Sequence, residues 1–156
     1  MNIFVLDEDP KISAELMCDK HIVKMILESA QMLCSAFPQG EAPYRRAFYN
    51  HPCTKWSRES VDNYEWLLTH SWALLEEYFE RYNKLHKSLN AIEWCEDNYH
   101  TLDLPQLGLT PFAQAMPDEY KNDDATQAYR NYYNGEKAYF AKWSYSSAPR
   151  WFKKTP

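Results

Sequence analysis

Apolar residues recur three or four positions apart along most of the chain, which is the spacing of a buried helix face. Asp9 and Pro10 suit the start of a first helix, because an acid caps the N-terminus and proline fits the first turn. Pro38 and Gly40 suit its end, near Phe37. The apolar stripe expected on this helix consists of Leu16, Val23, Ile26, Ala30, Leu33 and Phe37.

Three further helices follow from the same pattern, over residues 54–83, 85–98 and 125–143. Residues 38–53 and the proline-containing segment 101–124 are predicted connections, the second with at most a turn of helix. Residues 1–6, MNIFVL, are expected to form a short strand or to insert into the core. The predicted fold is therefore all-α: a single compact domain over residues 1–156, with about four main helices and a short extended N-terminal segment.

Composition supports this fold and indicates where in the cell the protein is expected. Only three of the 156 residues are glycine, which disfavours an all-β chain with many tight turns. No apolar run approaches the ~20 residues that span a bilayer, so no membrane partner is expected. MNIFVL has no basic flank and runs directly into acidic residues, unlike a signal peptide. Four cysteines without a CxxC pair indicate free thiols, so the predicted location is the cytoplasm.

The formal charge of −5 argues against tight sequence-independent binding of duplex DNA, although it leaves room for a local basic patch. Aromatic residues make up 16% of the chain. They suit core and rim packing, or stacking on nucleic-acid bases.

One polar strip interrupts the first predicted helix, in the stretch CDKHIVK at residues 18–24. Helical geometry places Cys18, His21, Lys24, Met25 and Glu28 on one side of this helix. The strip has three interpretations that the sequence leaves open: a solvated rim with i,i+4 pairs, a metal site or an active site. The metal site would be zinc held by Cys18, His21, His51 and Cys53, and the catalytic candidates are His21, Glu28, Lys24 and His51.

A second group of candidates combines basic and aromatic residues, as single-stranded nucleic-acid grooves do. Several lie on the last predicted helix and in the tail RWFKK, which ends at Lys154. The alternative is a solvated basic face offset by Glu136. The candidates for binding nucleic acid or substrate are Tyr44, Arg46, Trp56, Arg130, Tyr133, Lys142, Trp143 and Trp151.

Several segments also resemble known proteins. MNIFVLD, CDKHIVKMILESAQML, YNHPCTKW, LTPFAQAMPDEY, AYRNYY and PRWF occur in an order that resembles a group of small uncharacterised proteins of tailed phages. More distantly, the first helix, the His-Pro approach to the second, EEYFERYN and PRWF resemble the pyrimidine-dimer DNA glycosylases of the endonuclease V type from T-even phages.

The second resemblance implies an all-α fold and a site near the N-terminus. In that family the free α-amine of the processed second residue attacks the sugar C1′ beside a glutamate. The resemblance aligns His21 or Ile22 with that glutamate, and leaves Glu28 or Asp19 as carboxylates of different geometry. The predicted function is a phage-encoded enzyme of the host cytoplasm that acts on nucleic acid or nucleotides without a cofactor, by DNA glycosylase-like cleavage of an N-glycosidic bond; the expected partner is DNA or a nucleotide. The alternative is a non-catalytic helical module that binds a host protein or a small ligand.

Overall fold

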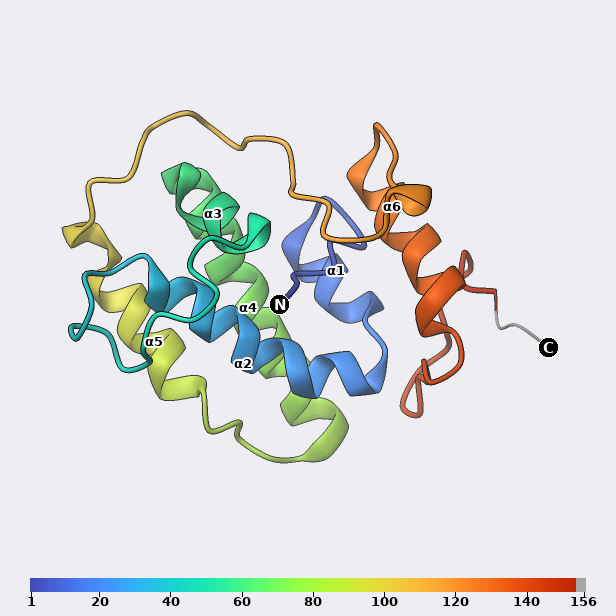
Figure 1. Cartoon of the computed structure of the whole chain (residues 1–156). Coiled ribbons are helices and arrows are strands. Elements are labelled where there is room, and N and C mark those ends of the chain that lie inside the picture. Colours follow the sequence, from blue (N-terminus) through green and yellow to red (C-terminus); the bar gives the residue numbers. More distant parts are fainter. Residues whose placement is uncertain (154–156) are drawn as a thin grey trace.

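Helix α4 runs through the middle of the fold and packs against α1, α2, α3 and α5 (Figure 1). The computed structural model describes residues 1–153, so Lys154 of the predicted basic tail lies outside the described residues. All regular elements over this range are helical, which confirms the all-α prediction, but six α-helices replace the four predicted. They are α1 (Pro10–Leu16), α2 (Asp19–Ser35), α3 (Pro52–Glu59), α4 (Val61–Tyr82), α5 (Leu89–Asn98) and α6 (Ala125–Tyr132).

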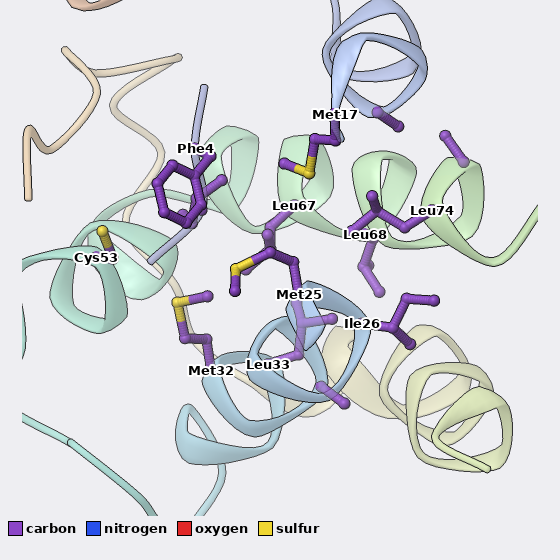
Figure 2. Close-up of a cluster of buried hydrophobic side chains, with 14 of the residues drawn as sticks. Phe4, Met17, Met25, Ile26, Met32, Leu33, Cys53, Leu67, Leu68 and Leu74 are labelled. Atoms are coloured by element: carbon purple, nitrogen blue, oxygen red, sulfur yellow. The ribbon is translucent and has the colours of Figure 1, made fainter. Parts of the chain in front are cut away.

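The core forms where α2 and α4 face each other. Figure 2 shows Met25, Ile26 and Leu33 of α2 meeting Leu67, Leu68 and Leu74 of α4. The stripe predicted for the first helix is buried at Ile26, Ala30, Leu33 and Phe37, but Val23 is 40% exposed. No helix in residues 1–153 is long and apolar enough to cross a membrane.

The N-terminal segment inserts into the core and forms no strand. Residues 2–6 are buried, and the Asn2 side-chain oxygen accepts hydrogen bonds from the backbone of Ile3 at 2.8 Å and Phe4 at 3.1 Å. The hydroxyl of Ser13 on α1 accepts a further bond from the Leu6 backbone. The segment's polar backbone groups are therefore met by side chains inside the protein, as burial demands.

The first predicted helix is in fact two, because the chain is extended at Met17 and Cys18. Arg81 of α4 donates hydrogen bonds to the carbonyl groups of Glu15 at 3.1 Å and Met17 at 2.8 Å. The backbone of Asp19 donates to the Lys142 carbonyl at 2.8 Å. These distant partners satisfy groups that a continuous helix would have bonded internally, so the break is stable.

The second predicted helix also divides, at Ser60, where the chain is again extended and Val61 donates to the carbonyl of Pro105. The last predicted helix is shorter than expected. α6 ends at Tyr132, a π-helical turn (η3, Tyr133–Lys137) follows, and the chain then leaves the helical path. The predicted loop 101–124 contains one short 3₁₀ turn, η2 (Asp118–Tyr120); another, η1 (Tyr99–Thr101), joins α5 to this loop.

Candidate active site

The Glu28 carboxylate lies against the N-terminus of the chain. Its Oε1 atom accepts a 2.9 Å hydrogen bond from the backbone nitrogen of Asn2 and lies 3.3 Å from the α-amine of Met1. Glu28 is 8% exposed, so these contacts are shielded from water. A single carboxylate oxygen thus holds the nitrogen atoms of the first two residues.

The side chain of Asn2 fixes this arrangement from the other direction. Besides accepting from Ile3 and Phe4, it donates through Nδ2 to the carbonyl of Ala115 at 2.9 Å. The hydroxyl of Tyr129 donates to Ala113 at 2.6 Å and accepts from Ala115 at 3.2 Å, which holds that loop in place. Residue 2 is therefore positioned by both ends of its carboxamide.

His51 lies within electrostatic range of the same groups. Burial, followed by the positive charge of the Met1 amine, lowers the pKa of His51, while Glu28 raises it. The ring also caps α3, because Nδ1 accepts a 3.0 Å hydrogen bond from the backbone of Cys53. The turn before α3 thus places an imidazole near the N-terminal amine.

His21 is packed inside the protein. Its Nδ1 lies 2.6 Å from the hydroxyl of Tyr133, and its ring stacks on Phe4 with 4.2 Å between centroids. Burial, reinforced by the charges of nearby lysines, lowers the pKa of His21 to about 3. The imidazole is therefore neutral at pH 7 and does not titrate near neutrality, as an unperturbed histidine would.

Three lysines surround the outer side of this histidine. Lys137, Lys24 and Lys20 each contribute positive charge at His21. Lys137 lies 4.9 Å from the ring of Tyr132, and Lys20 lies 5.0 Å from that of Phe140. Lys24 is exposed and precedes Glu28 by one turn of α2. Lys137 also lies 5.9 Å from the ring of Phe4, so a local basic surface lies beside His21 and Phe4 despite the net charge of −5.

The family model for pyrimidine dimer DNA glycosylases matches residues 1–90, more than half of the 156 residues.

The chain belongs to this family. The match includes Asn2, Glu28 and His51, but not the 113–115 loop that holds Asn2. Comparison with curated proteins and with solved structures found no match. Of the residues considered for the family's glutamate, Glu28 is the carboxylate in contact with the N-terminus, whereas Ile22 is buried in the core and His21 packs against Phe4. Asp19 instead pairs with Arg81 at 3.1 Å.

The residues predicted to bind nucleic acid fall into separate places. Trp56 and Tyr133 are at most 2% exposed and lie in the core, with no surface open for stacking on a base. Tyr44 is half-buried and bonds to Ser88, while Arg46 donates to the carbonyl of Phe37.

Four others lie in α6 and the segment after it. Arg130 donates to the Leu6 carbonyl at 3.0 Å and lies 5.4 Å from the ring of Trp151. Trp143 donates to the carbonyl of Leu16, whereas Lys142 is exposed. Arg130 and Trp143 thus attach this part of the chain to the N-terminal half.

The four candidate zinc ligands do not come together. Cys18 and His21 meet at the hydroxyl of Tyr133, whereas Cys53 lies about 4.0 Å from Asn2 and from Tyr129. Within residues 1–153, no group of three or more His, Cys, Asp or Glu side chains is placed to hold a metal ion.

A hollow of about 630 Å³ lies between the 109–114 loop and the start of α6. Its lining includes Glu8, Asp123 and Asp124, and none of the groups around the N-terminal amine. Acidic walls repel phosphate, so this hollow does not suit a DNA backbone.

Asn2 and Tyr129 are the main residues of the site that sequence reasoning missed. Tyr129 is one of several aromatic residues in the last predicted helix, and its hydroxyl contacts follow only from the tertiary structure. Asn2 carried one usable signal: asparagine side chains readily bond to the backbone two residues ahead, and here that bond reaches Phe4.

Proposed function

We propose that this protein cleaves the N-glycosidic bond of a damaged pyrimidine in duplex DNA, with its N-terminal α-amine as nucleophile and Glu28 as the acid–base group. The observation that carries the proposal is the shared contact of Glu28 Oε1 with the nitrogens of Met1 and Asn2. Membership of the pyrimidine dimer DNA glycosylase family supports the same substrate class.

The geometry suits the amine of either residue. If Met1 is removed, the α-amine of Asn2 is already 2.9 Å from the carboxylate, and its side chain remains bonded to Ala115. If Met1 is kept, its own amine lies 3.3 Å away. Asn2 is 7% exposed, and such a held nucleophile loses little freedom on reaching the transition state.

The proposed step exchanges one bond at C1′ for another. The amine nitrogen bonds to C1′ while the bond between C1′ and the damaged base breaks, and the base leaves with the bonding electrons and takes up a proton. Glu28 accepts the proton that the amine loses and passes it to the departing base, and its negative charge stabilises the positive charge that develops on the sugar. His51 lies beside this pair, and Lys24 supplies positive charge for the DNA backbone.

Borohydride trapping tests this chemistry, because reduction converts an amine–sugar imine into a stable bond. The protein is incubated with duplex DNA containing an abasic site, reduced, digested and mapped by mass spectrometry. An adduct on the N-terminal peptide is expected, and the same map shows whether residue 1 or residue 2 carries it. No adduct, or an adduct on a lysine such as Lys24, would overturn the proposed nucleophile.

Incision of ultraviolet-irradiated duplex DNA tests the substrate. The protein is expected to cut irradiated duplex and to leave the unirradiated duplex intact. Equal treatment of the two duplexes would contradict recognition of damaged pyrimidines, even if the trapping experiment succeeds.

A further inference from the structure

Phe48 has an unusual combination of exposure and backbone geometry. Its side chain is 65% exposed, and its φ of +50° lies in the left-handed region that bulky residues avoid. Because the ring is mostly exposed to water, packing inside the protein does not offset the unfavourable backbone conformation. Strain of this kind is retained where the surrounding structure enforces it, often at binding sites.

The surroundings of Phe48 do enforce this conformation. On one side, the Ser35 hydroxyl of α2 accepts a 3.3 Å hydrogen bond from the backbone of Ala47. On the other, His51 donates its backbone N–H to the carbonyl of Phe48 at 3.0 Å, which closes a tight turn. Phe48 is thus fixed at the start of a turn whose last residue is His51. The turn lies close to residue 2, because Cys53, whose backbone N–H is bonded to the His51 ring, has its Sγ atom 4.0 Å from Asn2 Oδ1. Figure 1 shows this connection between α2 and α3 passing near the N-terminus.

Arginines of the same connection and of α3 gather beside this turn. The guanidinium groups of Arg46 and Arg58 lie 4.4 Å and 3.8 Å from the ring centre of Tyr49. Arg58 also donates to the carbonyl of Tyr49 at 2.8 Å. Arg45 is exposed, and together with Arg46 it lines a surface hollow of about 330 Å³. Guanidinium groups bind phosphate oxygens in pairs of hydrogen bonds, so this surface suits a DNA backbone.

We propose that the turn Phe48–His51 is a wedge that opens duplex DNA, with Phe48 inserted into the base stack and Arg45 and Arg46 on the adjacent phosphates. This inference rests on the proposed function and adds the way in which the enzyme reaches C1′. Apolar side chains of other DNA-binding proteins enter base steps and unstack them. Enzymes that act on a base inside a duplex must first extrude a nucleotide, and a ring that fills the resulting gap favours the extruded state.

The test compares duplex and single-stranded DNA that carry the same abasic site. Phe48→Asn removes the ring and suits the left-handed backbone, so the variant should fold at least as well as the parent. The Phe48→Asn substitution should lower the rate of borohydride-trapped adduct formation on the duplex about tenfold or more, since stacking contacts have effects of this size. On single-stranded DNA, where no stack has to be opened, its rate should equal that of the parent.

Two further variants complete the experiment. Phe48→Leu keeps an apolar wedge and should recover most of the duplex rate. Phe79→Ala removes an exposed phenylalanine from the far end of α4 and should leave both rates unchanged. Fluorescence of 2-aminopurine placed beside the abasic site should rise on binding of the parent and stay low with Phe48→Asn, because unstacking increases its emission.

The outcomes separate the two proposals. If the parent forms no adduct on either DNA, the proposed amine chemistry fails, whereas the fluorescence rise still reports the wedge. Suppose instead that the parent forms the adduct. If Phe48→Asn then reacts at the parent's rate on the duplex, or has a rate lowered by the same factor on duplex and single-stranded DNA, the wedge is refuted and the amine chemistry stands.

Discussion

Arg81 and Asp19 form an ion pair of 3.1 Å across the joint between α1 and α2. Arg81 is 6% exposed and also binds Glu77 at 2.9 Å. Arg81→Met should lower the free energy of unfolding by about 3 kcal/mol, because it leaves buried carbonyls and carboxylates without their donor. Urea unfolding followed by circular dichroism measures the loss. Asp19→Asn leaves the other acceptors of Arg81 in place, so it should lower the free energy of unfolding by less than Arg81→Met does. Equal decreases in the two variants would contradict the central role of the guanidinium.

Glu28→Gln should separate charge from shape at the N-terminus. The amide oxygen can still accept the hydrogen bond from Asn2, so the unfolding curve should stay close to that of the parent. Adduct formation on abasic DNA should fall by about a hundredfold or more, as expected when an acid–base group is lost. The exposed residue Glu41, changed to glutamine, serves as the control. A Glu28→Gln variant with the parent's single-turnover rate would exclude this carboxylate from the reaction.

Asn2→Ala should loosen the N-terminal segment, because the amides of Ile3 and Phe4 lose their buried acceptor. We expect a loss of about 2 kcal/mol in unfolding free energy, typical of buried donors without partners. Hydrogen exchange at these two amides should become faster. Asn2→Asp keeps the acceptor oxygens, so it should preserve slow exchange; rapid exchange in both variants would show that the amides are protected in another way.

The buried histidines make stability depend on pH. Burial lowers the pKa of His70 to about 4 and that of His21 to about 3, both below the ordinary value of 6.5. The unfolded chain therefore binds protons that the folded chain does not, and stability falls as the pH drops below 6.5. Each histidine should cost about 2 kcal/mol at pH 5.

Replacing one of them tests this linkage. His70 donates through Nδ1–H to the carbonyl of Pro10 at 2.9 Å, and the side-chain amide of Asn can donate at a similar position. His70→Asn should reduce the dependence of unfolding free energy on pH by about 1.2 kcal/mol per pH unit between pH 6 and 5, whatever its absolute stability. Exposed His100, changed to asparagine, should leave the slope unaltered. An unchanged slope in His70→Asn would contradict the lowered pKa.

Periodicity predicted where helices lie but not where they break. Neither Met17–Cys18 nor Ser60 contains glycine or proline, so the local signal for an interruption is missing. Arg81 and the carbonyl of Pro105 stabilise these breaks from distant parts of the chain. Local patterns do not contain such contacts.

The candidate site was likewise predictable only in part: the polar strip could be placed on a helix, but the tertiary partners of its residues could not. Glu28 was a candidate because helical geometry placed it on a polar strip, and the structure gives it buried partners at the N-terminus. His21 shares that strip, but the ring of Phe4 and the hydroxyl of Tyr133 enclose it. Phe48 gave no signal, since neither its exposure nor its φ of +50° can be inferred from its neighbours.

The hydrogen bond from Asn2 to Ala115 joins residues 113 positions apart. Because a ribosome makes the chain from its N-terminus, Asn2 is synthesised long before its partner Ala115. Contacts of such long range form late and slow the folding of small domains. During synthesis, Phe4 can therefore meet His21 early, whereas the contacts of Asn2 with Ala115 and of Phe4 with Tyr133 have to wait for the last third of the chain.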